Sequence, residues 1–194
     1  MYDFHKDKRR YFHMQYLTAR EYILPFISQY RPIAAGYRVL EIGCGEAGVL
    51  RAFREAGCDC TGIELSESRV QNARLFHSEI DTPGEVRFIT RDIYDIDVET
   101  DLGHRFDVII LKDVIEHIPA QEKFIPRLRD FLAPDGVIFF GFPPWQMPFG
   151  GHQQVCRSVV LSKLPYFHLL PTALYQAVLR LFGESAKTRR NLQD

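Results

Sequence analysis

The run VLEIGCGEAG, at residues 39–48, constrains the fold of this chain more than any other feature. A short apolar strand ends in the acid Glu41 and then turns through glycines into a predicted helix. Gly43, Gly45 and Gly48 have the spacing G-x-G-x-x-G, which permits a tight turn and a close approach of backbone to a ligand. Dinucleotide enzymes and other nucleoside binders share this spacing, so it does not by itself decide between them.

Predicted strands and helices alternate after this run. Apolar strands are expected at residues 38–42, 60–65, 86–90, 106–111 and 137–142. Helices are expected between them, at residues 47–56, 66–77 and 119–132. Apolar strands of this kind, separated by helices, are typical of a doubly wound parallel sheet with right-handed crossovers. The expected fold class is therefore α/β, Rossmann-like, with helices on both faces of the sheet.

We predict a single domain in three parts. The parts are a helical N-terminal segment (1–36), the sheet-forming core (37–142), and a loop followed by a helical segment that acts as a lid (143–194). Pro25 should bend or interrupt the N-terminal helix, and Pro165 and Pro171 should interrupt the C-terminal one.

Three local signals give further expectations. Pro126 should kink the helix at 119–132 or delay its start, and the residues Pro134-Asp135-Gly136 should form a turn before the fifth strand. The polar residues 183–194 should be frayed.

Composition excludes several classes of protein. The formal net charge of −1 and the pI near 6.7 argue against broad attraction to nucleic acid. The charged N-terminus lacks the apolar stretch of a signal peptide, and no apolar run reaches the roughly 18 residues of a membrane span. The cysteines lack zinc-site spacing and should be free thiols, which favours no metal site and a cytoplasmic location; they are Cys44, Cys58, Cys60 and Cys156.

Candidate binding groups follow four of the predicted strands. Ligands of such sheets lie beyond the carboxyl ends of the strands. The first strand supplies Glu41 and the glycine run, and the second ends at Glu64, where an acid can accept hydrogen bonds from ribose hydroxyls. The third is followed by Asp92 and Ile93, which suit an adenine amino group and ring face. The fourth runs into the stretch LKDVIEH.

These stretches together resemble the class I S-adenosylmethionine-dependent methyltransferases. The resemblance covers residues 38–143 and is carried, in the family's order, by VLEIGCGEAG, GIELSES, RFITRDIYD, FDVIILKDVIEHI and LAPDGVIFFGFP. It is nearest to small-molecule methyltransferases of the ubiquinone-biosynthesis type. It implies a sheet with strand order 3-2-1-4-5, the cofactor S-adenosylmethionine with S-adenosylhomocysteine as its product, and a small-molecule methyl acceptor.

The resemblance also implies roles for single residues. Gly43, Cys44 and Gly45 should face the methionine part of the cofactor, with Glu41 near its amino or sulfonium group. The remaining implied contacts are Glu64 to the ribose, Leu65, Asp92 and Ile93 to the adenine, and the carbonyl of Leu111 or Lys112 to the amino group.

Two histidines are candidates for a general base. His117 follows the fourth strand, and His152 lies in a loop rich in proline and glycine after the fifth strand, which should overhang the acceptor. Histidine is a suitable base near neutral pH if the acceptor is a hydroxyl. The alternative is that they are ordinary histidines, of a helix face and of a surface loop. The expected reaction is methylation of an oxygen or nitrogen atom of a small molecule or of a lipid or glycan intermediate.

Other interpretations remain open. Members of the family usually add two more strands after the fifth, and residues 158–182 instead predict helix. This apolar segment favours packing or a lid over a membrane-surface helix, although peripheral membrane contact stays open. A non-catalytic S-adenosylmethionine-binding module and an NAD-dependent oxidoreductase are the alternative functions. The sequence does not predict the oligomeric state.

Overall fold

The computed structural model describes residues 7–149 and 153–192. The chain divides into two compact units, residues 2–142 and residues 143–194. The organisation as a single domain therefore stays a prediction, as does the role of the second unit as a lid.

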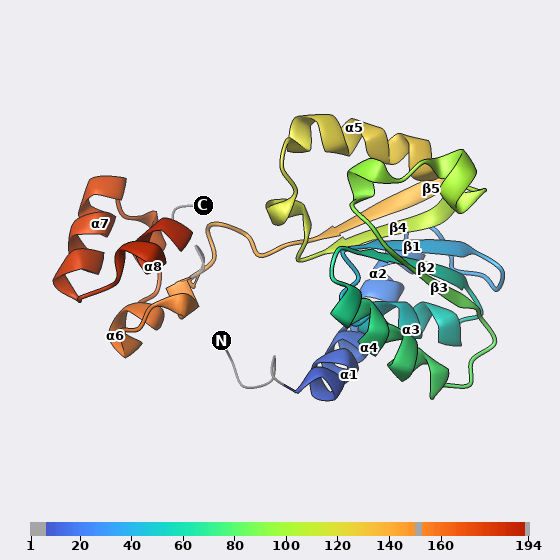
Figure 1. The fold of residues 1–194 in the computed structure, drawn as a ribbon, viewed down its shortest axis with the longest axis horizontal. Helices are drawn as coiled ribbons and strands as arrows, with labels where there is room; N and C mark the ends of the chain where they lie inside the picture. Colours follow the sequence, from blue (N-terminus) through green and yellow to red (C-terminus); the bar gives the residue numbers. More distant parts are fainter. Residues whose placement is uncertain (1–6, 150–152, 193–194) are drawn as a thin grey trace. The chain divides into compact units, whose positions relative to one another are not determined.

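The first unit is built on a parallel five-stranded sheet in the order β3-β2-β1-β4-β5 (Figure 1). Its strands are β1 (Arg38–Ile42), β2 (Asp59–Glu64), β3 (Val86–Thr90), β4 (Phe106–Lys112) and β5 (Leu132–Gly141). The predicted fold class and strand order are confirmed. Within the described ranges no strand follows β5, which therefore forms one edge of the sheet.

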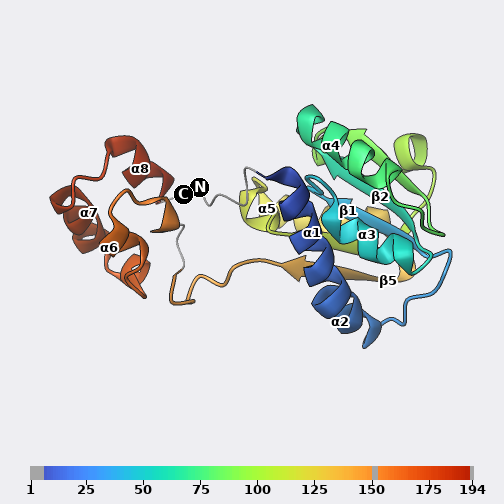
Figure 2. The ribbon, with the colours of Figure 1, turned by 90° about the horizontal axis from the view of Figure 1, so that it is seen from below.

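Helices cover both faces of this sheet. They are α1 (Lys8–Thr18), α2 (Leu24–Ser28), α3 (Gly48–Glu55), α4 (Glu67–Ser78) and α5 (Gln121–Phe131). Helices α1 to α4 lie on one face and α5 on the other, as Figures 1 and 2 show. Each face buries its own apolar cluster, one including Val39 and Phe53 and the other Leu40 and Phe124, because successive strand residues point to opposite faces.

The N-terminal segment stays helical through Pro25. A π-helical turn, Ala19–Ile23, joins α1 to α2, and Pro25 lies in the first turn of α2. Proline has no N–H group to donate to the preceding turn, and a π-helical turn is one way in which a helix can absorb such a defect. The predicted interruption therefore takes the form of a widened turn instead of a break.

Two expectations about the fifth strand and its helix need correction. Pro134, Asp135 and Gly136 do not form a separate turn but lie within β5, where the pairing with β4 is irregular between Phe106 and Val108. Pro126 lies inside α5 and does not mark its start, which is at Gln121, and the kink at Pro126 stays a prediction.

The second unit is helical. It contains α6 (Val159–Ser162), α7 (Thr172–Leu181) and α8 (Ala186–Asn191), which share a small apolar cluster that includes Leu161, Phe167 and Leu179. Pro165 and Pro171 lie between helices, as predicted. The expectation of a frayed terminus is wrong for α8, whose first turn is capped by the hydroxyl of Ser185.

Gly48, the third glycine of the run, lets α1 approach α3 closely. A Cβ atom at Gly48 would lie 2.3 Å from the carbonyl oxygen of Phe12 and 2.7 Å from the Cβ of Gln15. The first of these contacts is with backbone, so a side-chain rotation cannot relieve it. The buried carboxylate of Glu46 adds an ion pair with Lys8 of α1 at 3.0 Å.

Arg54 of α3 and His77 of α4 form a buried polar pair on the same face. The guanidinium of Arg54 donates to Nδ1 of His77 at 2.9 Å and to the carbonyl of Gly84 at 3.0 Å. A guanidinium can only donate, so Nδ1 accepts and the proton is on Nε2. Burial, with the nearby Arg54 and Arg51 charges, lowers the pKa of His77 to about 4, despite its bond to the Ala47 carbonyl.

We predict that Gly48→Ala destabilises the protein. The added methyl group must push α1 away from α3, and overpacking of this kind typically costs about 1–3 kcal/mol. Chemical denaturation would measure the change in the free energy of unfolding. A change below about 0.5 kcal/mol, the range of a neutral surface substitution, would contradict the close contact.

We also predict that stability falls as the pH drops from about 6.5 to 4 through His77. The unfolded histidine has a pKa of about 6.5 and the folded one a pKa of about 4, so the unfolded state binds the extra proton between these values. The stabilisation is complete above the unfolded pKa and is lost as the pH falls. Between pH 7 and 4 the free energy of unfolding of the wild type should drop about 3 kcal/mol more than that of His77→Gln. If the free energy of unfolding fell equally in the wild type and in His77→Gln over this pH range, the contribution of His77 would be refuted.

Candidate cofactor site at the carboxyl ends of the strands

A cavity of about 120 Å³ lies at the carboxyl ends of β1, β2 and β3. It brings together six of the predicted site residues: Gly43, Glu64, Leu65, Asp92, Ile93 and His117. The sequence reasoning missed its other lining residues, which are Ile42, Ile63, Arg91, Tyr94, Val114, Ile118 and Pro119. These residues lie next to the predicted ones in the sequence, so their position at the ends of the predicted strands was the signal that could have identified them.

Glu64 is fixed by backbone amides at the mouth of the glycine loop. Its Oε2 accepts from the amide of Gly45 at 2.9 Å, and its Oε1 accepts from the amide of Ser66 at 3.0 Å. Each carboxylate oxygen can accept a further hydrogen bond. The carboxylate is therefore held in one orientation and can still bind a pair of hydroxyl groups.

The first amides of the glycine loop are already used within the protein. Both Gly43 and Cys44 donate to the carbonyl of Ile63 in β2, at 2.8 and 3.1 Å. The Gly45 amide is taken by Glu64. These three groups, which often bind phosphate in glycine-rich loops, are thus not available to an anionic ligand here.

Steric contacts explain why glycine stands at two positions near the loop. A Cβ at Gly43, where φ is +69°, would lie 2.5 Å from Val114. A Cβ at Gly62 of β2 would lie 2.7 Å from the Sγ of Cys44. The side chain of Cys44 is thus packed on β2, so any ligand contact of this residue would be made by its backbone. Burial raises the pKa of the Cys44 thiol well above its usual value, and the charges of Glu41 and Glu64 add to the effect.

Glu41 is a buried carboxylate with an unused oxygen. Its Oε2 has no hydrogen-bond partner among the described residues, and its residue is only 3% exposed. Burial raises the pKa of Glu41 well above its usual value, although the positive charge of Lys112 opposes this. A buried acceptor without a partner suits a ligand that brings a cationic donor to the end of β1.

Lys112 ends β4 and forms an ion pair with Asp113. Burial alone would lower the pKa of Lys112, but the hydrogen bond and charge of Asp113, together with the charges of Tyr11 and Glu41, outweigh burial and raise the pKa. Lys112 therefore stays protonated near Glu41. Leu111 is fully buried within β4.

The third strand end forms the apolar side of the cavity. Asp92 caps the short helical turn that follows β3, with its Oδ1 accepting from the amide of Tyr94 at 2.9 Å. This cap turns the buried side chain of Ile93 to the cavity wall. The Tyr94 hydroxyl donates to the carbonyl of Pro119 and so joins this turn to the segment after β4.

The two candidate bases have different outcomes. His117 lines the cavity together with the predicted adenosine-binding residues. His152 lies outside the described residues. Cys44, Gly45, Glu41, Leu111 and Lys112 adjoin the loop or the ends of β1 and β4 but are not among the residues that line the cavity.

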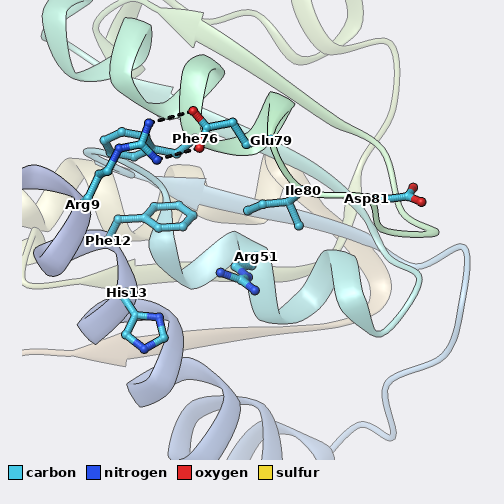
Figure 3. Close-up of a pocket in the computed structure, with 8 residues that line it drawn as sticks. All are labelled: Arg9, Phe12, His13, Arg51, Phe76, Glu79, Ile80 and Asp81. Atoms are coloured by element: carbon cyan, nitrogen blue, oxygen red, sulfur yellow. Dashed lines mark hydrogen bonds and ion pairs between the residues drawn. The ribbon is translucent and has the colours of Figure 1, made fainter.

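A larger cavity, of about 470 Å³, lies on the surface beside α1, α3 and α4 (Figure 3). Arg9 lines it and donates to both carboxylate oxygens of Glu79, at 2.6 and 2.7 Å. None of the predicted site residues in the described part of the chain lines it. Although this cavity is the larger of the two, its lining residues do not support a role as the cofactor site.

The described residues also bear on metals and membranes. They contain no group of three or more histidine, cysteine, aspartate or glutamate side chains placed to hold a metal ion. Among their helices, none combines the length and the apolar composition needed to cross a membrane.

Known proteins resemble this chain over more than half of its length. A relative from Bordetella avium (strain 197N), described as ubiquinone biosynthesis O-methyltransferase, is 28% identical over 88% of this chain and 71% of its own length. The alignments with the next curated relatives span half of those proteins or less.

Two solved structures share the fold. The plantazolicin methyltransferase BpumL, in complex with a monoazolic desmethylPZN analog and SAH, has a TM-score of 0.53 at 20% identity, over 69% of this chain and 49% of its own. A Haemonchus contortus phosphoethanolamine N-methyltransferase 2, in complex with phosphomonomethylethanolamine and S-adenosylhomocysteine, has a TM-score of 0.51 at 28% identity, over 60% and 27%.

A family profile described as "Methyltransferase domain" matches residues 12–152. This range contains the whole sheet, the glycine loop and the cavity at the strand ends. The chain therefore belongs to the methyltransferase domain family and has the fold of the class I S-adenosylmethionine-dependent methyltransferases.

Proposed function

We propose that this protein transfers the methyl group of S-adenosylmethionine to an oxygen atom of a small molecule. The observation that carries the proposal is the cavity in which Glu64, fixed by two amides, faces the apolar wall of Ile93 and Leu65. A ribose needs a paired acceptor and an adenine needs an apolar slot. The printed name of the Bordetella relative, an O-methyltransferase, supports oxygen as the acceptor atom.

Each lining residue has a proposed role. Glu64 accepts hydrogen bonds from the two ribose hydroxyls, and Leu65 and Ile93 pack on the adenine. The Oδ1 atom of Asp92 forms the capping bond, and the second carboxylate oxygen accepts a hydrogen bond from the adenine amino group. His117, on the opposite side from β3, also contacts the adenosine, and we prefer this role to that of a base because it shares the cavity with Ile93.

The methionine end of the cofactor would lie over the glycine loop and the ends of β1 and β4. We propose that Glu41 uses its unpaired oxygen to balance the cationic amino or sulfonium group. The carbonyl of Leu111 or Lys112 accepts from the amino group. Lys112, which stays protonated, keeps Glu41 from carrying an uncompensated charge in the absence of ligand.

The loop amides argue against the oxidoreductase alternative. A dinucleotide places its pyrophosphate on the amides of the glycine loop. Here the amides of Gly43, Cys44 and Gly45 are bonded to Ile63 and Glu64. A cofactor without phosphate, such as S-adenosylmethionine, does not need them.

The bound cofactor supplies an electrophilic methyl group on a sulfonium. The protein then has to align the acceptor oxygen with this methyl group and exclude water. An acceptor hydroxyl must lose its proton, and His152 remains our candidate for that base. Its loop follows β5, and a base at this position would contribute about a hundredfold or more.

The location of the protein and its partners are also proposals. All four cysteines are free and buried, which supports a reducing compartment such as the cytoplasm. The proposed acceptor is a free small molecule or a lipid or glycan intermediate, and no nucleic-acid partner is proposed.

We predict that the protein binds S-adenosylhomocysteine and that Glu64→Gln weakens this binding at least tenfold, or ~1.4 kcal/mol. The variant keeps one acceptor oxygen but loses the charge that strengthens bonds from the ribose hydroxyls. Isothermal titration calorimetry with S-adenosylhomocysteine, and separately with NAD, would measure both affinities.

Glu67→Gln is the matched control for this experiment. Glu67 lies in the first turn of α4, three residues after Glu64, and does not line the cavity. The affinity of the Glu67→Gln variant for S-adenosylhomocysteine should equal that of the wild type. Binding of NAD with no uptake of S-adenosylhomocysteine would reverse the proposed function, and equal effects of both variants would remove the ribose role of Glu64.

The two histidines should differ in kinetic effect. His117→Ala should raise the KM for S-adenosylmethionine several-fold with a smaller change in kcat, because it removes a cofactor contact. His152→Ala should lower kcat by about a hundredfold and leave the KM for the cofactor unchanged, because it removes the base. Steady-state methyl transfer to a panel of phenolic acceptors measures both. Unchanged turnover of His152→Ala with an efficient acceptor would exclude this histidine as the base.

A further inference from the structure

The glycine loop contains one strained residue that is not a glycine. Ala47 has φ 61° and ψ 34°, the left-handed conformation, at the position just before α3. Side chains rarely adopt this conformation because Cβ crowds the backbone, and it persists only where the surroundings enforce it. Ala47 is completely buried, so the enforcing contacts must come from the protein.

Two hydrogen bonds fix the backbone of Ala47. Its amide donates to the carbonyl of Cys44 at 2.7 Å, which closes the turn of the loop. Its carbonyl accepts from Nε2 of His77 at 2.9 Å. The second bond comes from α4, thirty residues further along the chain.

His77 is itself held in the one tautomer that can make this bond. Arg54 donates to Nδ1, which leaves the proton on Nε2 for Ala47. The imidazole is further confined by ring-edge contacts with Phe12 and Phe88, at centroid distances of 5.5 and 5.4 Å. Arg54 is anchored in turn on the carbonyl of Gly84.

We propose that His77 is a positioning residue for the cofactor site. Its imidazole, oriented by Arg54, holds Ala47 in the left-handed conformation and so fixes the loop at residues 43–48 against the cofactor. This inference rests on the proposed function for its consequence, which is cofactor affinity. The loop conformation itself does not depend on what the loop binds.

Three substitutions separate this role from simple packing. His77→Phe keeps a ring between Phe12 and Phe88 but removes the donor to Ala47. His77→Gln keeps a donor at the position of Nε2 and should rescue the function. Ala47→Gly removes the strain, because glycine adopts the left-handed conformation without Cβ crowding. It should therefore restore much of what His77→Phe loses.

The experiment measures two quantities on each full-length variant. The first is amide hydrogen exchange of the peptide that covers residues 43–53, and the second is the Kd for S-adenosylhomocysteine by calorimetry. Leu128→Ala is the control for general destabilisation, since Leu128 is fully buried in α5 on the other face of the sheet. All proteins are compared well below their melting temperatures.

His77→Phe should exchange about tenfold faster in this peptide and bind about tenfold more weakly than the wild type. His77→Gln should lie within about threefold of the wild type, and His77→Phe with Ala47→Gly should recover most of both losses. Leu128→Ala should change neither quantity.

Wild-type exchange in this peptide for His77→Phe would overturn the proposal, as would failure of Ala47→Gly to recover either loss. If the wild type takes up no S-adenosylhomocysteine, the proposed function fails, and the exchange data still decide whether His77 holds the loop.

Discussion

The hydrogen bonds from the Gly45 and Ser66 amides to Glu64 are the constraint on which the candidate site depends. They join the end of β2 to the loop after β1, so the two strand ends are held together. The carbonyl of Ile63 reinforces this by accepting from Gly43 and Cys44. The same carboxylate faces the cavity, so the group that binds the ribose in our proposal is also the group that shapes the loop.

Much of the fold follows from local sequence signals. The strands at Arg38–Ile42 and Val86–Thr90 have the predicted bounds, because continuous apolar residues between turn signals are clear markers of buried strands. The predicted clustering of Gly43, Glu64 and Asp92 is confirmed as geometry, because parallel strands bring their carboxyl ends to one edge of the sheet. Their roles toward a cofactor stay predictions.

Other features depend on contacts between distant residues and could not be read from the sequence. Pro134 and Gly136 carry a turn signal, yet they lie within β5, in its irregular part, where the register skips from Leu132 to Val137 and pairs neither residue with β4. Gly48 fits the glycine pattern, but a glycine is needed there because the backbone of Phe12 on α1 leaves no room for a Cβ atom. The sequence around Gly48 does not reveal this contact with a distant residue. Likewise, Arg54 and His77 look like surface residues of two helices until α3 and α4 are packed together.

The double acceptance by Ile63 has a consequence for the energetics of ligand binding. A loop that is ordered only by its ligand must lose conformational entropy at the moment of association, which reduces the affinity gained from new contacts. Here the protein itself bonds three successive amides to β2. The free energy of ordering this segment belongs to folding, so a nucleoside ligand without phosphate groups can bind with little further loss of entropy from the loop.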